Sequence, residues 1–526
     1  MGRTVGIFPA VELARRARLF EAIGAIFDLR FEGRNSEVMD GLDGAIRFPA
    51  ASPIEAAQIP TLNISSVSRA EVSRSLRFTT ASTLDYTIRG RTLVENRAPA
   101  VSVRPRPGDA ILATCEGKPV WTTCIRSGAP NHLVAVAPDE VVAGETLGDQ
   151  LVPGRFLALM ALLEFARCLD AGWSKVPLDA AFIFDDPNLH APSYGHIAFR
   201  RLAAHARRFG YHAVMASIPR DLGYASPAAI HIFRSHSDVL SLTVHGNNHL
   251  SNELNRERSP EEDLSLAAQS LTRTMRFEQR TGIVVSHVMC APHEVCGQSM
   301  MRALFRVGFD GLAIEQVSLR SALDEPSPHL GILPADRVCN GLSAVPRQLL
   351  GTSQDALVLT AFLRQPLLIY GHHWDLARGY DRLAAIADFI HGLGDVHWGP
   401  LSHAVRDKYS WRSRGDRLEV RLYGRTASIA CDTTPASLEL VIPSLASREG
   451  LEVSIAGGAW QRMSSESRQQ IPLPRGLHAS IDVELRPIDA AVAAGVPSPN
   501  WAPWPALRRT ATEIRDRMAV LSGNRR

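Results

Sequence analysis

Hydrophobic and polar positions alternate in two different ways along the chain, and the change falls near residue 411. Before it, short apolar runs are separated by stretches whose apolar residues recur every three or four positions, which is typical of strands followed by helices. After it, apolar and polar residues alternate one by one between turn signals, which is typical of half-buried antiparallel strands. The chain is therefore predicted to be α/β over most of its length, with an all-β part near its end.

Residues 1–172 form the first predicted domain. Its apolar runs predict strands near 5–8, 44–48, 61–64, 110–114, 119–123 and 132–137, with helices near 10–23 and 154–169. This order predicts an open, doubly wound sheet, and the pattern is similar to that of flavodoxin-type and class I glutamine-amidotransferase-type domains. No G-x-C-x-G elbow or glycine-rich phosphate loop is present, and Cys115 lacks flanking glycines. We therefore expect a non-catalytic accessory domain.

Residues 173–408 contain longer strand and helix units. Strands are predicted near 180–184, 213–218, 239–244, 283–289, 311–314 and 367–370, and helices near 196–209, 260–280, 298–307 and 376–393. Strands that are followed by helices and repeat in one direction form a parallel sheet, closed here into a distorted (β/α) barrel. The carboxyl ends of its strands are where we expect functional residues.

Residues 409–487 are predicted to form a small β-sandwich, with strands near 418–422, 428–431, 438–441, 451–455 and 479–485. The tail, residues 488–526, combines a strap rich in Pro and Ala with a helix near 506–521. Trp501 and Trp504 in the strap offer aromatic faces that would suit sugar rings. Such straps more often pin a tail to a domain surface, and we favour that structural role.

The composition is that of an ordinary globular protein. The 526 residues are 45% hydrophobic and 21% charged, with a formal net charge of +3, which excludes a disordered or fibrous chain. Arginines are scattered along the sequence. Neither the charge nor its distribution therefore indicates a nucleic-acid or anionic-membrane partner.

Cysteine usage and apolar run lengths bear on the compartment. The seven cysteines include no C-x-x-C pair, so reduced thiols fit better than disulfides or a cysteine zinc site. Charged residues interrupt the N-terminal stretch, unlike a secretory signal. The longest apolar run, residues 156–166, is shorter than the roughly 20 residues that span a bilayer. We expect a cytoplasmic protein with no membrane span.

Two adjacent carboxylates, Asp185 and Asp186, directly follow an apolar strand in the segment FDDPN. Two carboxylates held close together repel unless a cation or a shared proton separates them. On its own, such a pair is more often a loop cap than a metal site. Its meaning therefore depends on what the other strand ends carry.

A second polar segment, HGNNH, follows another apolar strand and places His245 and His249 four residues apart. One helical turn or tight loop would bring both imidazoles to one face, where they would suit Zn²⁺. Two surface histidines are an equally good interpretation of this spacing in isolation. One aspartate with both histidines, however, makes a three-ligand set that leaves a position for water, as catalytic zinc sites do.

Two more polar clusters end later strands. MCAPHEVCG contains His293, and LLIYGHHWD contains His372 and His373. Histidines that close buried strands are frequently core residues. Clusters at the same end of successive strands, however, favour one shared site.

Taken in order, these segments resemble the polysaccharide deacetylase family, carbohydrate esterase family 4, over residues 176–405. The matching segments are FDD (Asp185, Asp186), HGNNH (His245, His249), CAPHEVCG (loosely, Pro292 and Gly297) and GHHWD (His372). The sequence also departs from the family. Pro187 and Asn188 replace the usual glycine, Gly246 replaces a serine or threonine, and VMCAPHE lacks the arginine that usually orients the catalytic aspartate. These departures indicate altered tuning of Asp185, an unusual substrate or an inactive enzyme.

The resemblance implies a metal site and a base. Asp186, His245 and His249 would bind Zn²⁺ or another divalent transition metal, which would activate water and polarise an amide carbonyl. Asp185 would be the general base that accepts the proton of the water.

The resemblance also implies the remaining catalytic groups. His372 would be the general acid that protonates the leaving amine, with His373 as the rival, because HHWD resembles an H-P-W-E variant of the last family motif. The backbone N–H of His293 would help to form an oxyanion pocket.

The implied activity is metal-dependent removal of an N-acetyl group from an amino sugar or glycoconjugate. A cytoplasmic location would favour a short N-acetylated sugar or its conjugate as substrate. Two alternatives stay open: a metal-dependent amidase acting on a non-sugar amide, and a catalytically inactive carbohydrate-binding protein. With a short cytoplasmic substrate, the N-terminal domain and the β-sandwich would wall the cleft or form the interface of a homo-oligomer. In the inactive carbohydrate-binding protein, these flanking domains would instead bind glycan.

Overall fold

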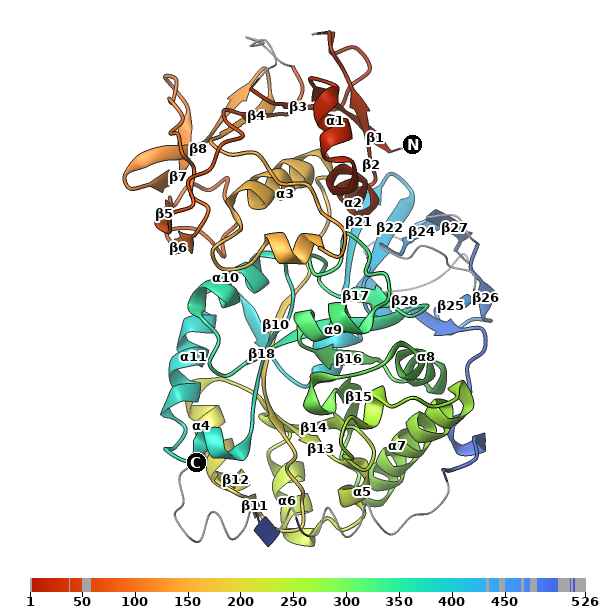
Figure 1. Ribbon diagram of the computed structural model, residues 1–526. Coiled ribbons are helices and arrows are strands. Elements are labelled where there is room, and N and C mark those ends of the chain that lie inside the picture. Colours follow the sequence, from red (N-terminus) through yellow and green to blue (C-terminus); the bar gives the residue numbers. More distant parts are fainter. Residues whose placement is uncertain are drawn as a thin grey trace. The chain divides into compact units, whose positions relative to one another are not determined.

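The computed structural model describes residues 2–36, 38–49, 58–431, 435–443, 450–464, 468–473, 480–499, 511, 514 and 515. Its chain divides into two compact units (Figure 1). The first unit contains Met1–Trp173, Glu325–Leu333 and Ser353–Leu363, and the second contains Ser174–Asp324, Pro334–Thr352 and Arg364–Arg526. The predicted domain boundaries at 172/173, 408/409 and 487/488 stay predictions.

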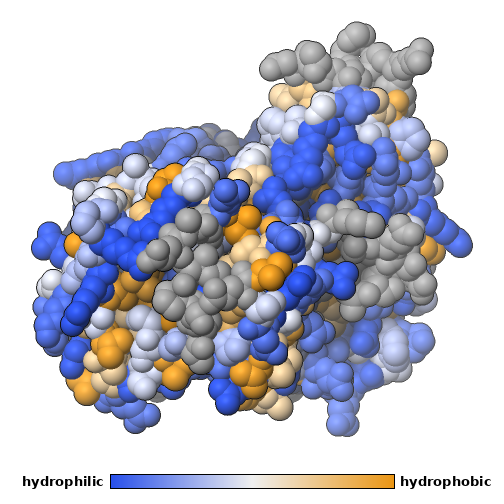
Figure 2. Space-filling model, turned by 90° about the horizontal axis from the view of Figure 1, so that it is seen from above, coloured by the Kyte–Doolittle hydropathy of each residue, from blue (hydrophilic) through white to orange (hydrophobic). Residues whose placement is uncertain are grey.

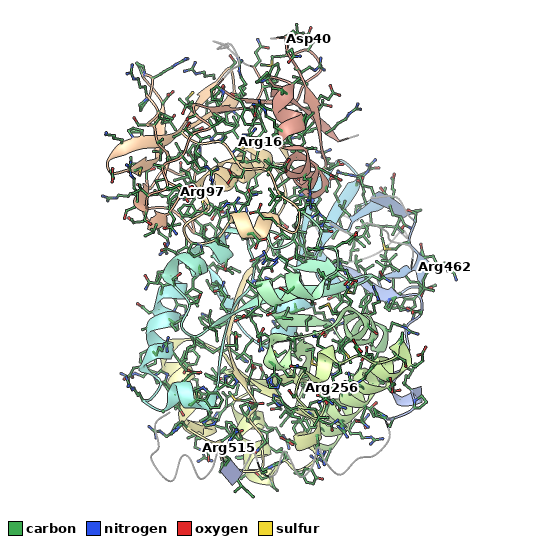
Figure 3. The ribbon with its side chains drawn as sticks, in the orientation of Figure 1. Arg16, Asp40, Arg97, Arg256, Arg462 and Arg515 are labelled. Carbon is green, nitrogen blue, oxygen red and sulfur yellow. The ribbon has the colours of Figure 1, made fainter. Side chains whose placement is uncertain are left out.

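Surface features agree with the composition. Figure 2 shows hydrophilic residues over most of the visible face, with smaller hydrophobic patches between them. Figure 3 labels Arg16, Arg97, Arg256 and Arg462, which come from four separate parts of the chain. Within the described ranges, no helix combines the length and the apolar character that a membrane span requires.

The first unit contains a nine-stranded mixed sheet in the order β2-β1-β3-β4-β9-β8-β7-β5-β6. Its parallel half contains β1 (Arg3–Phe8), β2 (Leu29–Gly33), β3 (Gly44–Arg47), β4 (Thr61–Ile64) and β9 (Ala129–Val134). Its antiparallel half contains β5 (Arg74–Phe78), β6 (Thr92–Glu95), β7 (Ala110–Cys115) and β8 (Lys118–Arg126). The sequence did not predict β2, β5 and β6, and the flavodoxin-type interpretation stays a prediction.

Helices of the first unit are α1 (Val11–Arg15), α2 (Ala17–Phe27), α3 (Leu157–Leu169) and α10 (Gln354–Phe362). The single helix expected over 10–23 is divided at Arg16, whose φ of −130° lies outside the helical range. The helix expected over 154–169 is α3, which starts three residues later.

A closed barrel of seven parallel strands forms the centre of the second unit, as predicted. The strands are β10 (Leu178–Asp185), β13 (Ala213–Ser217), β14 (Leu240–His245), β15 (Val285–Cys290), β16 (Gly311–Ile314), β18 (Leu342–Leu349) and β19 (Leu367–Gly371). Pairing of β10 with both β19 and β13 closes the ring. All eight residues of β10 are buried, as expected of a strand covered on both faces. The sequence did not predict β18.

Helices and short elements surround the barrel strands. The helices are α4 (Phe199–Phe209), α5 (Pro219–Leu222), α6 (Pro227–Ser235), α7 (Pro260–Thr281), α8 (Gln298–Val307), α9 (Gln316–Ala322), α11 (Asp381–His391) and α12 (Leu401–Val405). The short strands are β11 (Ser193–Tyr194), β12 (Ile197–Ala198), β17 (Asp336–Val338) and β20 (Val396–Trp398). Local chemistry sets the helix ends: α7 begins with a capping box between Ser259 and Glu262 and ends at Gly282, whose φ is +68°.

Two four-stranded sheets follow the barrel. One contains β21 (Tyr409–Arg414), β22 (Arg417–Leu422), β24 (Ser437–Val441) and β27 (Arg468–Pro472), and the other β23 (Thr426–Ala430), β28 (Ser480–Pro487), β25 (Leu451–Ile455) and β26 (Gln461–Arg462). The expectation of wholly antiparallel sheets is wrong, because β22 and β24 are parallel. The β-sandwich stays a prediction. Trp501, Trp504 and most of the helix expected over 506–521 lie outside the described residues.

Candidate metal centre

The carboxyl end of β10 carries the two adjacent aspartates. Asp185 is the last residue of the strand and is buried, whereas Asp186 has a φ of +76° and begins the following loop. Asp186 Oδ1 lies 3.0 Å from Nε2 of His249 and 3.7 Å from Nε2 of His245. The backbone turn at Asp186 thus gives the two neighbouring carboxylates different surroundings.

The loop after β14 carries both histidines, and Glu253 shapes it. The buried Glu253 carboxylate accepts hydrogen bonds from the backbone N–H groups of Asn247 (2.8 Å), Asn248 (3.0 Å) and His249 (3.0 Å). Gly246 has a φ of +66°, and a Cβ there would lie 2.8 Å from Glu253 Oε2. The loop therefore requires glycine at this position, and a serine or threonine there would be strained and would collide with Glu253.

Asp186, His245 and His249 lie close enough together that they could hold a metal ion. One ligand atom from each residue lies within 4.8 Å of the other two. The Nδ1 atom of the buried His245 lies 3.0 Å from the carbonyl oxygen of Cys290. When Nδ1–H donates this hydrogen bond, Nε2 keeps a lone pair for a metal. Burial lowers the pKa of His245 to about 4, so its ring stays neutral, as a ligand must be.

The arginine that VMCAPHE lacks is supplied by another strand. Arg347, on β18, is buried and donates a hydrogen bond from Nη1 to Asp185 Oδ1 at 3.0 Å. Its Nη2 atom donates to the carbonyl oxygen of Ala291 at 2.9 Å and to Glu294. VMCAPHE itself contains no arginine, as the sequence analysis states, but Arg347 contacts Asp185 from a different strand. Sequence reasoning did not single out Arg347 as a candidate site residue.

A buried network extends from Arg347 away from the metal set. The guanidinium lies 4.2 Å from the ring centroid of Tyr370, whose hydroxyl donates to Glu315 at 2.7 Å. Glu294 accepts from the backbone N–H of Glu315 at 2.7 Å. Burial acts to lower the pKa of Arg347, but the carboxylates of Asp185 and Glu294 outweigh it and raise the value. The guanidinium is thus a permanent cation that holds the Asp185 carboxylate in place.

Strand register puts these side chains on one face of the barrel. Pairings around the ring give the same face to Asp185, His245, Cys290, Arg347 and Tyr370. All five side chains are buried. The predicted sharing of one site by successive strand ends thus has a direct physical basis in the register.

The two histidines after β19 have different surroundings. Because Phe184 pairs with Gly371, the next residues, Asp185 and His372, continue the two strands at the same level. The His372 ring stacks on Trp374, with centroids 4.4 Å apart. The buried ring of His373 instead packs against Tyr194 and His196, at 5.3 and 5.8 Å. Of the pair, His372 is thus the one whose backbone runs level with Asp185.

His293 lies at the metal set as well. It has a φ of +56° in the short helix Pro292–Glu294 that follows β15. Its exposed ring lies 5.0 Å from the ring of His249. The strand end that the resemblance singled out therefore approaches the predicted ligands.

Comparison with known proteins gives structural neighbours only. No family model matches the chain, and no curated protein matches it. The carbohydrate deacetylase Agd3 is 9% identical, with 92% of this chain and 98% of that chain covered and a TM-score of 0.49. A family 4 carbohydrate esterase from Streptomyces lividans in complex with acetate is 15% identical, with 44% and 93% covered and a TM-score of 0.25.

A CE4 family pseudoenzyme from Bacillus anthracis is 10% identical, with 43% of this chain and 65% of that chain covered and a TM-score of 0.26. These neighbours fit the resemblance to polysaccharide deacetylases inferred for residues 176–405. With TM-scores below 0.5, the likenesses carry no argument about chemistry. The case for a metal centre rests on the side-chain geometry.

Proposed function

We propose that the protein is a metal-dependent deacetylase that removes the N-acetyl group from an amino sugar or glycoconjugate. The observation that carries this proposal is the combination of the Asp186, His245 and His249 cluster with Asp185, which Arg347 holds beside it. Structural sites use all four ligand positions for protein groups, whereas a three-ligand set leaves one for water. The donor set of one carboxylate and two imidazoles suits Zn²⁺ or another divalent transition metal.

A bound metal would supply Lewis-acid chemistry, lowering the pKa of water and polarising a carbonyl. Asp185 accepts the proton of the attacking water, because the hydrogen bond from Arg347 fixes the position of its carboxylate. His372 donates a proton to the leaving amine, and its position level with Asp185 supports this choice over His373. The backbone N–H of His293 donates to the developing oxyanion.

The proposal is tested by incubating the purified protein with N-acetylated monosaccharides, oligosaccharides and nucleotide-linked sugars, and by measuring released acetate. We expect release that stops on chelation and returns when Zn²⁺ is added. Release from simple non-sugar amides but from no sugar would favour the amidase alternative. Sugar binding without release would favour the inactive carbohydrate-binding protein. The cytoplasmic location stays a prediction that cell fractionation tests.

A further inference from the structure

Three arginine side chains gather near the loop that carries the histidine ligands. They are Arg220 on α5 and Arg273 and Arg276 on α7. Arg258 and Asp263, near the start of α7, form an ion pair at 3.3 Å. In the part of the chain that the structure describes, no carboxylate forms an ion pair with any of the three arginines. Cations that gather without counter-charges repel one another, and a bound anion removes this cost.

Two of the three arginines contact the loop directly. The backbone N–H of Arg220 donates to the carbonyl oxygen of Asn247 at 3.3 Å. The Nη1 atom of Arg273 donates to the side-chain oxygens of Asn247 at 2.7 Å and Asn248 at 2.9 Å. Both asparagines lie between the two histidines of the metal set, and α5 packs against α7 (Figure 1). A group bound by these arginines is therefore a neighbour of the metal centre.

Hydrogen-bond donors remain available on all three side chains. Arg273 makes its hydrogen bonds to described residues through Nη1 alone, which leaves Nε and Nη2 for a ligand. The guanidinium groups of Arg220 and Arg276 donate to no described residue. Arg276 is exposed, and Arg220 and Arg273 are half-buried, so a ligand can reach all three from solvent.

The charges of the three arginines also act on one another. Burial lowers the pKa of Arg273, and the positive charges of Arg220 and Arg276 lower it further. The Glu253 carboxylate opposes this effect, but it already accepts backbone hydrogen bonds from the loop. Because a guanidinium stays charged at any physiological pH, the excess of positive charge persists until an anion binds.

We propose that Arg220, Arg273 and Arg276 bind a phosphate group of the substrate. The inference rests on the proposed deacetylase function and narrows its substrate class to N-acetylated sugars that carry a phosphate or a diphosphate. Such a group has about two negative charges and several acceptor oxygens, which match several guanidinium forks better than a single carboxylate does. This agrees with the expectation of a short N-acetylated sugar or its conjugate.

The phosphate would serve as a handle that is remote from the reacting amide. Binding energy gained at such a group is used to place the amide over the metal and the base. Arg273 links the two sites, because the same guanidinium holds the asparagines of the loop. Loss of the handle therefore weakens the binding of phosphorylated sugars and leaves neutral sugars without a preference to lose.

Binding is measured by calorimetry in an Asp185→Asn background, with N-acetylglucosamine, its 1-phosphate and its uridine diphosphate conjugate as probes. We expect the phosphorylated probes to bind about tenfold more tightly than the neutral sugar, the scale of one charged hydrogen bond. Arg220→Gln and Arg276→Gln should each remove most of this preference. The backbone contact of Arg220 with the loop survives its substitution.

Arg302→Gln is the matched control. Arg302 is an exposed arginine on α8 that likewise forms no ion pair with a described residue, so its loss changes the net charge equally. Preference for both phosphorylated probes assigns the site to a single phosphate, and preference for the diphosphate conjugate alone assigns it to a diphosphate. Equal affinity for neutral and phosphorylated sugars overturns the inference. A preference that survives in both glutamine variants also overturns it, because the phosphate would then bind elsewhere, for instance at the metal.

Kinetics of the protein that retains Asp185 separate the two proposals. KM should be lower for the phosphorylated sugars than for the neutral sugar, and Arg220→Gln and Arg276→Gln should reduce this difference. Acetate release with the same KM from neutral and phosphorylated sugars would overturn the phosphate site while the enzyme function stands. Binding of phosphorylated sugars through the arginines without acetate release would keep the phosphate site and overturn the enzyme function.

Discussion

The two ends of strand β10 each hold an aspartate against a buried cation. At the amino end, Asp179 is paired with Lys408, whose Nζ also donates to the carbonyl oxygen of Pro177 at 2.7 Å. At the carboxyl end, Asp185 is paired with Arg347 at 3.0 Å. Both cations are buried, so each pair is held in a medium where an unpaired charge is costly.

What differs is the surroundings of each pair. Asp179 also accepts from His397 at 3.1 Å, and no three-ligand cluster lies there among the described residues. Asp185, in contrast, is followed directly in the chain by a second carboxylate, that of Asp186. The Oδ1 atom of Asp185 lies 4.0 Å from Nδ1 of His245. We therefore propose that the Asp179–Lys408 pair serves stability at one end of the barrel, whereas the Asp185–Arg347 pair orients a catalytic group at the other end.

Asp185→Asn has the largest expected effect on activity. The amide keeps the shape of the side chain but accepts no proton, so kcat should fall about 10²–10⁴-fold, the usual contribution of a general base. Metal content should be retained. Asp179→Asn is the matched control at the other end of the strand and should lower stability while the folded protein keeps its kcat. If the Asp185→Asn variant lost its metal, Asp185 would be the metal ligand and Asp186 the general base.

Replacing each buried cation in turn tests whether its ion pair contributes to stability alone or to activity as well. Arg347→Met and Lys408→Met each leave a buried carboxylate unpaired, which should lower the free energy of unfolding by about 3–5 kcal/mol. Urea denaturation measures this loss. Only Arg347→Met should also lower kcat of the folded protein, because only Arg347 holds Asp185. Equal kcat in both variants would remove Arg347 from the catalytic arrangement.

Gly246→Ala tests the loop that carries the histidines. Its φ of +66° and the 2.8 Å approach of Glu253 predict backbone strain of about 1–3 kcal/mol together with weaker metal binding. Gly282→Ala is the control, since Gly282 has a φ of +68° but nothing within 4 Å of an added Cβ. Melting temperature and zinc affinity are measured for both. Loss of zinc affinity in Gly282→Ala to the same degree would assign the effect to general strain.

The smallest expected effect is the pH dependence of the Asp179 end. The hydrogen bond that the His397 ring donates to the Asp179 carboxylate raises the pKa of His397 against the opposing effect of burial. Protonated His397 therefore stabilises the fold below the unfolded histidine pKa of about 6.5, and this contribution is lost as pH rises through the raised folded value. Unfolding by urea at about pH 6 and about pH 9 should show a larger loss in the parent than in His397→Gln. An equal change in the free energy of unfolding between the two pH values in the parent and in His397→Gln would exclude a contribution from His397.

Strand periodicity predicted six of the seven barrel strands, because each is a short apolar run. It missed β18, whose sequence LSAVPRQL contains Pro346 and Arg347 within the strand. A proline and a charge normally argue against a central strand, and here two carboxylates compensate the buried guanidinium. The ion pairs with Asp185 and Glu294, which only the structure shows, explain why an arginine can be buried in this strand.

The sequence could predict that Asp186, His245 and His249 lie together, because they end or closely follow two apolar strands. Their role as metal ligands stays a prediction. The loop geometry could not be predicted, since it depends on Glu253, a buried carboxylate whose three backbone contacts leave no periodic signal. The preference for Gly246 likewise follows from a backbone angle that the sequence alone does not state. The antiparallel half of the sheet in the first unit was not predicted either, because the direction of a strand depends on which strands pair with it.

Metal content tests the central claim most directly. Plasma mass spectrometry of the purified protein should find about one equivalent of zinc or another divalent transition metal, the amount that one three-ligand site holds. His245→Ala should lose it, since His245 supplies a buried ligand atom, whereas His372→Ala should keep it and lose activity. A His245→Ala protein that folds and retains its full metal content would contradict the account.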